Sequence, residues 1–200
     1  MKPLIQIFAI LVPALAVAAG AADKVEDPIS VLRRGVDEVL AVAYDGVGDQ
    51  NQPLSDRVRG VFAKYFEFET VTKRAVGPAW RKLDKSEQAK ITDLFTTLVL
   101  RTYVDNFEPV ERPEIQFGTA VELSATRQEL PTTVVYAGKS YSVSYRVEKT
   151  PEGWMIYDVI AERVSMIANY RAQFEAILQK GGASALIESL EENIRNARKT

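Results

Sequence analysis

Apolar residues recur at helical spacing through the first part of the chain. Asp27 followed by Pro28 supplies a helix N-cap and a proline at the first helical position, and the apolar repeat continues to about Tyr44. A polar loop then separates this helix from a second one at Leu54–Tyr65 and a short third one at Glu69–Val76. The pattern therefore predicts a helical N-terminal region.

The longest predicted helix spans about Lys85 to Phe107. Asp84 with Glu87 three residues later is typical of a capping box at its start. Its apolar positions cover more than a single stripe, so we expect the helix to be buried on more than one side.

The pattern changes to alternation between about residues 114 and 160. Within Ser140–Glu148, every second residue is apolar or aromatic, which predicts a strand with one apolar face. Short turns at Gly138 and Gly153 indicate an antiparallel meander. The four predicted strands are Thr132–Tyr136, Ser140–Glu148, Trp154–Val159 and Ile115–Leu123.

Helical spacing returns at Met166, stops at Gly181 and Gly182, and resumes through Leu186 to Ile194. The predicted fold class is α+β, with N-terminal helices, a central antiparallel sheet of about four strands and C-terminal helices. The apolar side chains of the sheet face and the long helix either form a packed core or enclose an apolar cavity for a hydrocarbon ligand. Pattern alone does not separate these two readings.

The first 22 residues are typical of a cleaved export signal. Lys2 precedes an apolar run from Leu4 to Val17, and small residues follow up to Ala22. The run is shorter than the roughly 20 residues that span a bilayer. We therefore expect residues 1–22 to be removed on export and residues 23–200 to form a single domain.

Composition excludes several kinds of chemistry. The sequence contains no His and no Cys, which rules out imidazole and thiolate nucleophiles and the metal sites built from them. The net charge of -2 argues against a nucleic-acid partner. Close pairs of acidic residues are typical of solvent-exposed helix faces and do not indicate acid–base catalysis. We therefore expect no enzymatic activity and no cofactor.

One segment near the C-terminus carries a resemblance to a known family. Residues 158–174, beginning Asp158-Val-Ile-Ala-Glu-Arg-Val-Ser165, resemble the C-terminal signature of the MlaC family, also called toluene-tolerance auxiliary proteins. Gly77, Trp80 and Tyr103 upstream fall at spacings similar to those of that family. The sequence departs from the signature at Arg163, where the family usually has glycine.

The resemblance implies a periplasmic lipid shuttle without catalytic residues. Such a protein carries phospholipid between an inner-membrane ABC transporter complex with an MCE ring and an outer-membrane lipoprotein complex. A related branch is associated with hopanoids, so a polycyclic lipid is an alternative cargo; an adaptor with a packed core is another alternative. By the resemblance, the candidate lipid-binding residues are Tyr103, Tyr141, Val143 and Val164. Helical and strand spacing extends this set to Trp80, Val99, Phe107, Tyr145 and Ile167.

Overall fold

The structure is a computed structural model that describes residues 26–105 and 111–197. Its N-terminal region contains α2 (Pro28–Tyr44), α3 (Leu54–Tyr65) and α4 (Phe68–Val76). The Asp27 carboxylate accepts a hydrogen bond from the Ser30 backbone N–H at 3.1 Å and so caps α2. The three predicted N-terminal helices are confirmed. The predicted signal peptide lies outside the described residues.

A 3-10 helix, η1 (Gly77–Lys82), connects α4 to α5 (Lys85–Leu100). Both hydrogen bonds of the predicted capping box between Asp84 and Glu87 are present at the start of α5. The helix predicted from Lys85 to Phe107 starts where predicted, but its described end, η2 (Arg101–Asp105), is a π-helix, and the predicted end at Phe107 lies outside the described residues.

A long-range contact lies at the end of this π-helical turn. The Asp105 carboxylate accepts hydrogen bonds from the backbone N–H and hydroxyl of Ser55, at 2.9 and 2.8 Å, in the first turn of α3. A carboxylate at this position satisfies a free helix N–H group. The apolar repeat in the sequence reflects local spacing only and carries no information about this long-range contact. It therefore could not predict where the α-helix gives way to a π-helix.

The strands form one antiparallel sheet in the order β1-β3-β4-β5-β6, with β2 also paired to β3. This confirms the predicted antiparallel meander, although the sheet has six strands where about four were expected. The bounds are β1 (Glu114–Phe117), β2 (Val121–Ser124), β3 (Arg127–Tyr136), β4 (Lys139–Thr150), β5 (Gly153–Ala161) and β6 (Val164–Ser165).

The predicted strand Ile115–Leu123 is divided into β1 and β2. At the break, the Gly118 N–H donates to the Pro131 carbonyl at 2.8 Å, and a Cβ at Gly118 would lie 3.1 Å from the Pro131 ring. The N–H and C=O of one residue face the same side of an antiparallel ladder, so Pro131 leaves this edge without a donor. The interruption of the strand therefore follows from a proline on the neighbouring strand.

The last element is α6 (Met166–Ala197), which contains two helical segments joined at Gly181 and Gly182. Gly182 has φ +64°, a conformation that glycine adopts without steric cost. The predicted interruption of the C-terminal helix is confirmed. None of the helices in the described part of the chain is long and apolar enough to cross a membrane.

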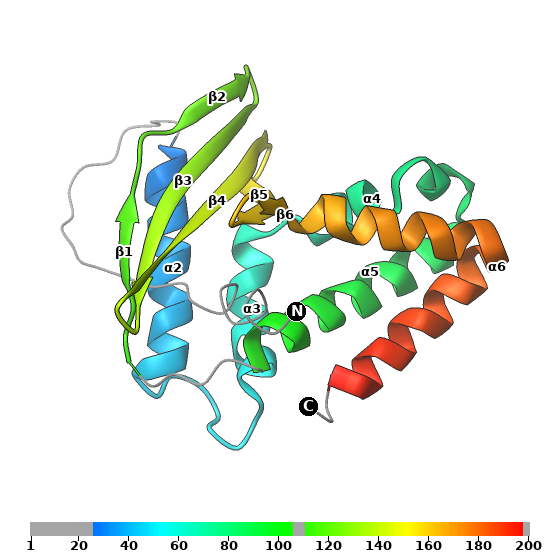
Figure 1. Ribbon diagram of the computed structural model, residues 1–200, viewed down its shortest axis with the longest axis horizontal. Coiled ribbons are helices and arrows are strands. Elements are labelled where there is room, and N and C mark those ends of the chain that lie inside the picture. Colours follow the sequence, from blue (N-terminus) through cyan, green and yellow to red (C-terminus); the bar gives the residue numbers. More distant parts are fainter. Residues whose placement is uncertain (1–25, 106–110, 198–200) are drawn as a thin grey trace.

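Two main apolar clusters organise the molecule. In the first, α2 packs along one face of the twisted sheet together with Tyr65 of α3. In the second, α4, α5 and α6 pack against one another beside the sheet (Figure 1). The long helix α5 thus belongs mainly to the helical cluster and does not cover the sheet.

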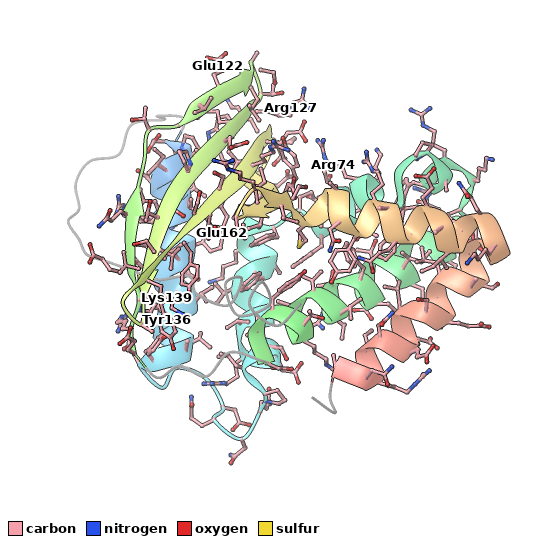
Figure 2. The ribbon with its side chains drawn as sticks, in the orientation of Figure 1. Arg74, Glu122, Arg127, Tyr136, Lys139 and Glu162 are labelled. Atoms are coloured by element: carbon pink, nitrogen blue, oxygen red, sulfur yellow. The ribbon has the colours of Figure 1, made fainter. Side chains whose placement is uncertain are left out.

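Polar contacts cross the junction between the two clusters. Arg74 of α4 donates to the Glu148 carboxylate of β4 at 2.6 Å, and its guanidinium lies 4.1 Å from the Tyr157 ring centre. Figure 2 shows Arg74 where the sheet meets the helical cluster. On β5, the Asp158 carboxylate accepts from the Ile167 N–H at 3.1 Å and caps the start of α6. The junction therefore depends on hydrogen bonds and charge as well as on apolar packing.

Candidate functional site

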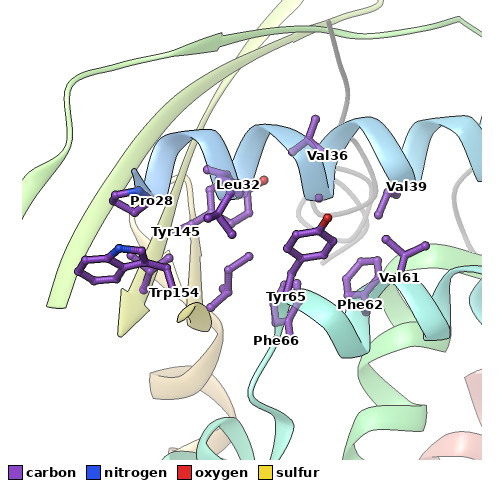
Figure 3. A pocket seen from close by; sticks show the side chains of 14 residues that line it. Pro28, Leu32, Val36, Val39, Val61, Phe62, Tyr65, Phe66, Tyr145 and Trp154 are labelled. Atoms are coloured by element: carbon purple, nitrogen blue, oxygen red, sulfur yellow. The ribbon is translucent and has the colours of Figure 1, made fainter. Parts of the chain in front are cut away.

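An apolar pocket lies between α2, α3 and the inner face of the sheet (Figure 3). Its cavity volume is about 20 Å³, room for about one water molecule and far below the roughly 300–1,000 Å³ of pockets that hold drug-sized ligands. The lining residues are Pro28, Val31, Leu32, Gly35, Val36, Val39, Val61, Phe62, Tyr65, Phe66, Tyr145, Val147, Trp154 and Ile156.

The periodicity of each element explains which residues face the pocket. Pro28, Leu32, Gly35 and Val39 follow one another three or four residues apart, so they lie on one face of α2. On β4 and β5, the lining residues are two apart, because alternate side chains of a strand point to the same side of the sheet. Helix α2 and the sheet therefore form facing walls.

Gly35 sets how closely α2 and α3 approach. A Cβ built on Gly35 would lie 2.9 Å from Cγ of Tyr65, which is too close for an unstrained contact. The Tyr65 hydroxyl donates to a Glu38 carboxylate oxygen at 2.7 Å. Burial, followed by this hydrogen bond, raises the pKa of Tyr65 to about 12. The phenol is therefore neutral at physiological pH and is held by a hydrogen bond.

Aromatic rings extend the pocket at its α3 end. The Phe62 and Phe66 rings are stacked with centroids 5.0 Å apart, and Phe66 stacks on Phe68 at 5.7 Å. Phe62 and Phe66 line the pocket, whereas Phe68 begins α4. This stack leads from the pocket towards the helical cluster.

The pocket has few polar side-chain groups. The Tyr145 side chain is only 1% exposed, and burial raises the pKa of its phenol above the ordinary value. The Trp154 indole Nε1 is buried and has no hydrogen-bond partner among the described residues. The pocket is therefore suited to a mainly hydrocarbon ligand.

The sequence-predicted site residues on β4 lie in the cluster that contains the pocket. Tyr145 lines the pocket. Val143 is buried in the same apolar cluster and Tyr141 packs against it, but neither belongs to the lining. Tyr141, Val143, Tyr145 and Val147 follow the predicted alternation, with the intervening residues less buried.

The other predicted site residues are not beside this pocket. Trp80 and Ile167 are buried in the helical cluster, and Val99 and Tyr103 pack against it. Val164, in β6, is 41% exposed, and Phe107 lies outside the described residues. Lipid contact by these residues remains a prediction, and the structure does not bring them together with Tyr145.

Sequence reasoning did not identify α2 and α3 as the pocket wall. Their apolar residues Leu32, Val36 and Phe62 served only to predict the two helices. The available signal was the repeated apolar face of α2, which contains a glycine at position 35. A glycine on an apolar helix face indicates a close approach to another element, and here that element is Tyr65.

The chemistry of the site favours binding of an apolar molecule. Within the described ranges, Asp and Glu side chains do not come together in a group that could hold a metal ion, and the sequence has no His or Cys. The lining residues include no acidic or basic side chain. What the site offers a ligand is apolar surface, with a small number of hydrogen-bonding groups for orientation.

The fold and this pocket define a small α+β protein whose sheet and N-terminal helices enclose an apolar pocket. The family described as MlaC protein matches residues 33–192, so the chain belongs to the MlaC family. This is a family of lipid-binding proteins and not of enzymes.

A solved structure supports the same assignment. The phospholipid-binding protein from Ralstonia solanacearum, determined in complex with a phospholipid, has a TM-score of 0.78 and 26% sequence identity to this chain. The match covers 86% of this chain and 99% of the other. No curated protein matches the sequence.

Proposed function

We propose that this protein is a periplasmic carrier of phospholipid. In this proposal, residues 1–22 direct export and are removed, and the domain formed by residues 23–200 carries lipid between an inner-membrane MCE-type ABC transporter complex and an outer-membrane lipoprotein complex. The observation that carries the proposal is the apolar pocket between α2, α3 and the sheet. Membership of the MlaC family and similarity to a phospholipid-binding structure support it.

Transfer of acyl chains from water supplies the binding energy. Each buried methylene contributes about 0.8 kcal/mol, so a 16-carbon chain gains on the order of 12 kcal/mol before ordering costs. This requires neither a catalytic group nor a cofactor, and we propose neither. Because the cavity of about 20 Å³ is far smaller than a ligand site, we expect α2 and α3 to move away from the sheet when an acyl chain enters.

Lipid analysis tests the proposal directly. The protein, purified without detergent and incubated with phospholipid vesicles, is extracted with organic solvent and analysed by mass spectrometry. We expect phospholipid in a fixed ratio to protein. Absence of lipid after incubation contradicts the carrier function and favours an adaptor with a packed core.

A substitution that fills the pocket gives a second test. Val39 of α2 lines the pocket and is partly buried, so the larger ring of Val39→Trp occupies ligand space at limited cost to folding. We expect this variant to lose most of its bound lipid, measured as the lipid-to-protein ratio.

The matched control for this variant is Val47→Trp, because Val47 is 50% exposed in the loop after α2 and does not line the pocket. It should retain the wild-type lipid ratio. Equal lipid content in the two folded variants contradicts the assignment of this pocket as the lipid site.

A further inference from the structure

A hydrogen-bond donor without an acceptor lies at one end of the pocket. Trp154 is 8% exposed, and its Nε1 has no partner among the described residues. Figure 3 shows the indole beside Pro28, with the nitrogen on the edge that faces this residue and the first turn of α2. An indole N–H can only donate, and a buried donor without an acceptor lowers stability.

Among the described residues, the side chains that line the pocket offer few acceptors for this donor. The Tyr65 hydroxyl is already engaged by Glu38 at 2.7 Å. Apart from Tyr65, Tyr145 and Trp154, the side chains that line the pocket are hydrocarbon. A ligand that enters the pocket can therefore supply an acceptor that the described residues do not.

The charges around Pro28 determine which kind of acceptor fits. Asp27 precedes Pro28 and caps α2 with its carboxylate. Glu26 lies next to Asp27, and the Arg34 guanidinium is already paired with Glu26. An anionic phosphate at this end would add its charge to that of the Asp27 carboxylate, and the nearby Arg34 guanidinium is already paired with Glu26. A carbonyl oxygen carries no net charge, so it meets weaker repulsion.

We propose that the Trp154 indole N–H donates a hydrogen bond to the ester carbonyl of an acyl chain. This inference rests on the proposed lipid-carrier function and assigns a polar contact to it. A neutral acceptor joined directly to a long apolar chain is the group that suits an indole N–H within an otherwise hydrocarbon pocket. The ester end of the chain lies beside Pro28, and the hydrocarbon extends towards Phe62.

Ester-linked and ether-linked lipids separate this contact from general apolar binding. The delipidated protein is incubated with vesicles that contain equal amounts of dipalmitoyl phosphatidylethanolamine and its dihexadecyl ether analogue. Both lipids have the same head group and chain length, and only the ester lipid has carbonyl oxygens. We expect the wild-type protein to retain about fivefold more ester lipid than ether lipid, measured by mass spectrometry.

Trp154→Phe removes the N–H and keeps an aromatic ring, so it should bind both lipids in nearly equal amounts. The matched control is Tyr157→Phe, which removes a polar hydrogen from the same strand. Tyr157 is buried but does not line the pocket. This control should keep the wild-type preference for the ester lipid.

The outcomes distinguish the two proposals. Equal retention of ester and ether lipid by the wild-type protein overturns the Trp154 contact while leaving the carrier function intact, and this result does not depend on any variant folding. An ester preference that persists in folded Trp154→Phe also overturns it. Failure of the wild-type protein to retain either lipid overturns the carrier function itself.

Discussion

At the scale of single residues, the turn between β5 and β6 carries unusual backbone geometry. Glu162 and Arg163 have φ values of +48° and +68°, in the left-handed region that side chains with a Cβ rarely adopt. The Glu162 N–H donates to the Ser142 carbonyl at 2.9 Å, which anchors the turn to β4. The resemblance to the MlaC signature places glycine at position 163, and the observed geometry explains why glycine suits this turn.

Replacing Arg163 by glycine should therefore stabilise the protein relative to replacement by alanine. Both variants remove the arginine side chain, but only Arg163→Gly removes the Cβ that disfavours positive φ. We expect Arg163→Gly to have a free energy of unfolding about 0.5–1 kcal/mol above that of Arg163→Ala, measured by urea denaturation. Equal stability of the two variants would contradict the role of backbone geometry here.

At the scale of elements, two helical glycines differ in what surrounds them. Gly35 of α2 faces the Tyr65 ring of α3, whereas Gly60 of α3 has open space where its Cβ would be. Both are interior helix positions, where glycine costs stability relative to alanine. Comparing the effect of alanine at the two positions therefore measures the energetic cost of crowding the contact between α2 and α3.

Alanine at these two positions should have opposite effects. We expect Gly35→Ala to lower the free energy of unfolding by about 1–3 kcal/mol, because its Cβ would overlap the Tyr65 ring. Gly60→Ala should raise it by about 0.5–1 kcal/mol. Chemical denaturation of both variants checks this, and a stabilising Gly35→Ala would show that the helices separate without cost.

The sequence identifies elements better than it identifies their partners. Asp27, Pro28 and the Asp84 capping box are local signals, so the starts of α2 and α5 were predictable. The break between β1 and β2 depends on Pro131 of the neighbouring strand, and the π-helical turn ends in a contact between Asp105 and α3. Contacts of this kind are not contained in the local pattern.

At the scale of the whole molecule, the local sequence pattern likewise does not show which elements form the pocket. An apolar face shows that a helix is buried but does not show which layer it meets. The strand face containing Tyr145 was assigned correctly to the inside of the sheet, while α5 was expected to face it and packs with α6 instead. Helix α2 provides the facing wall.

Asp158 connects the sheet to α6. Asp158 is 3% exposed, and its carboxylate accepts from Ser165 Oγ at 2.7 Å and from the Ile167 N–H at 3.1 Å, with Arg146 Nη1 at 3.6 Å. Burial is the largest influence and raises the pKa of Asp158, although these partners oppose it. The ionised carboxylate is therefore less favourable in the folded protein than in the unfolded chain.

This raised pKa predicts a particular pH dependence of stability. Below the unfolded-state pKa, Asp158 is protonated in both states and contributes no pH dependence. As pH rises through the unfolded-state and then the raised folded-state pKa, the unfolded chain ionises more readily and folding stability is lost. Asp158→Asn lacks this loss, so the stability of the variant relative to wild type should increase with pH.

Urea denaturation of both proteins between about pH 3 and pH 7 measures this change. The constant effect of replacing a carboxylate by an amide cancels, because only the change with pH is compared. A relative stability of Asp158→Asn that decreases with pH would show that the hydrogen bonds and Arg146 outweigh burial.

The interruption between β1 and β2 also limits association between copies of this protein. An uninterrupted edge strand presents a row of unpaired backbone groups to which a neighbouring molecule can add a strand, which is a common start of aggregation. Here the edge consists of two four-residue strands separated at Gly118. Pro131 thus helps to keep the protein from polymerising through its sheet.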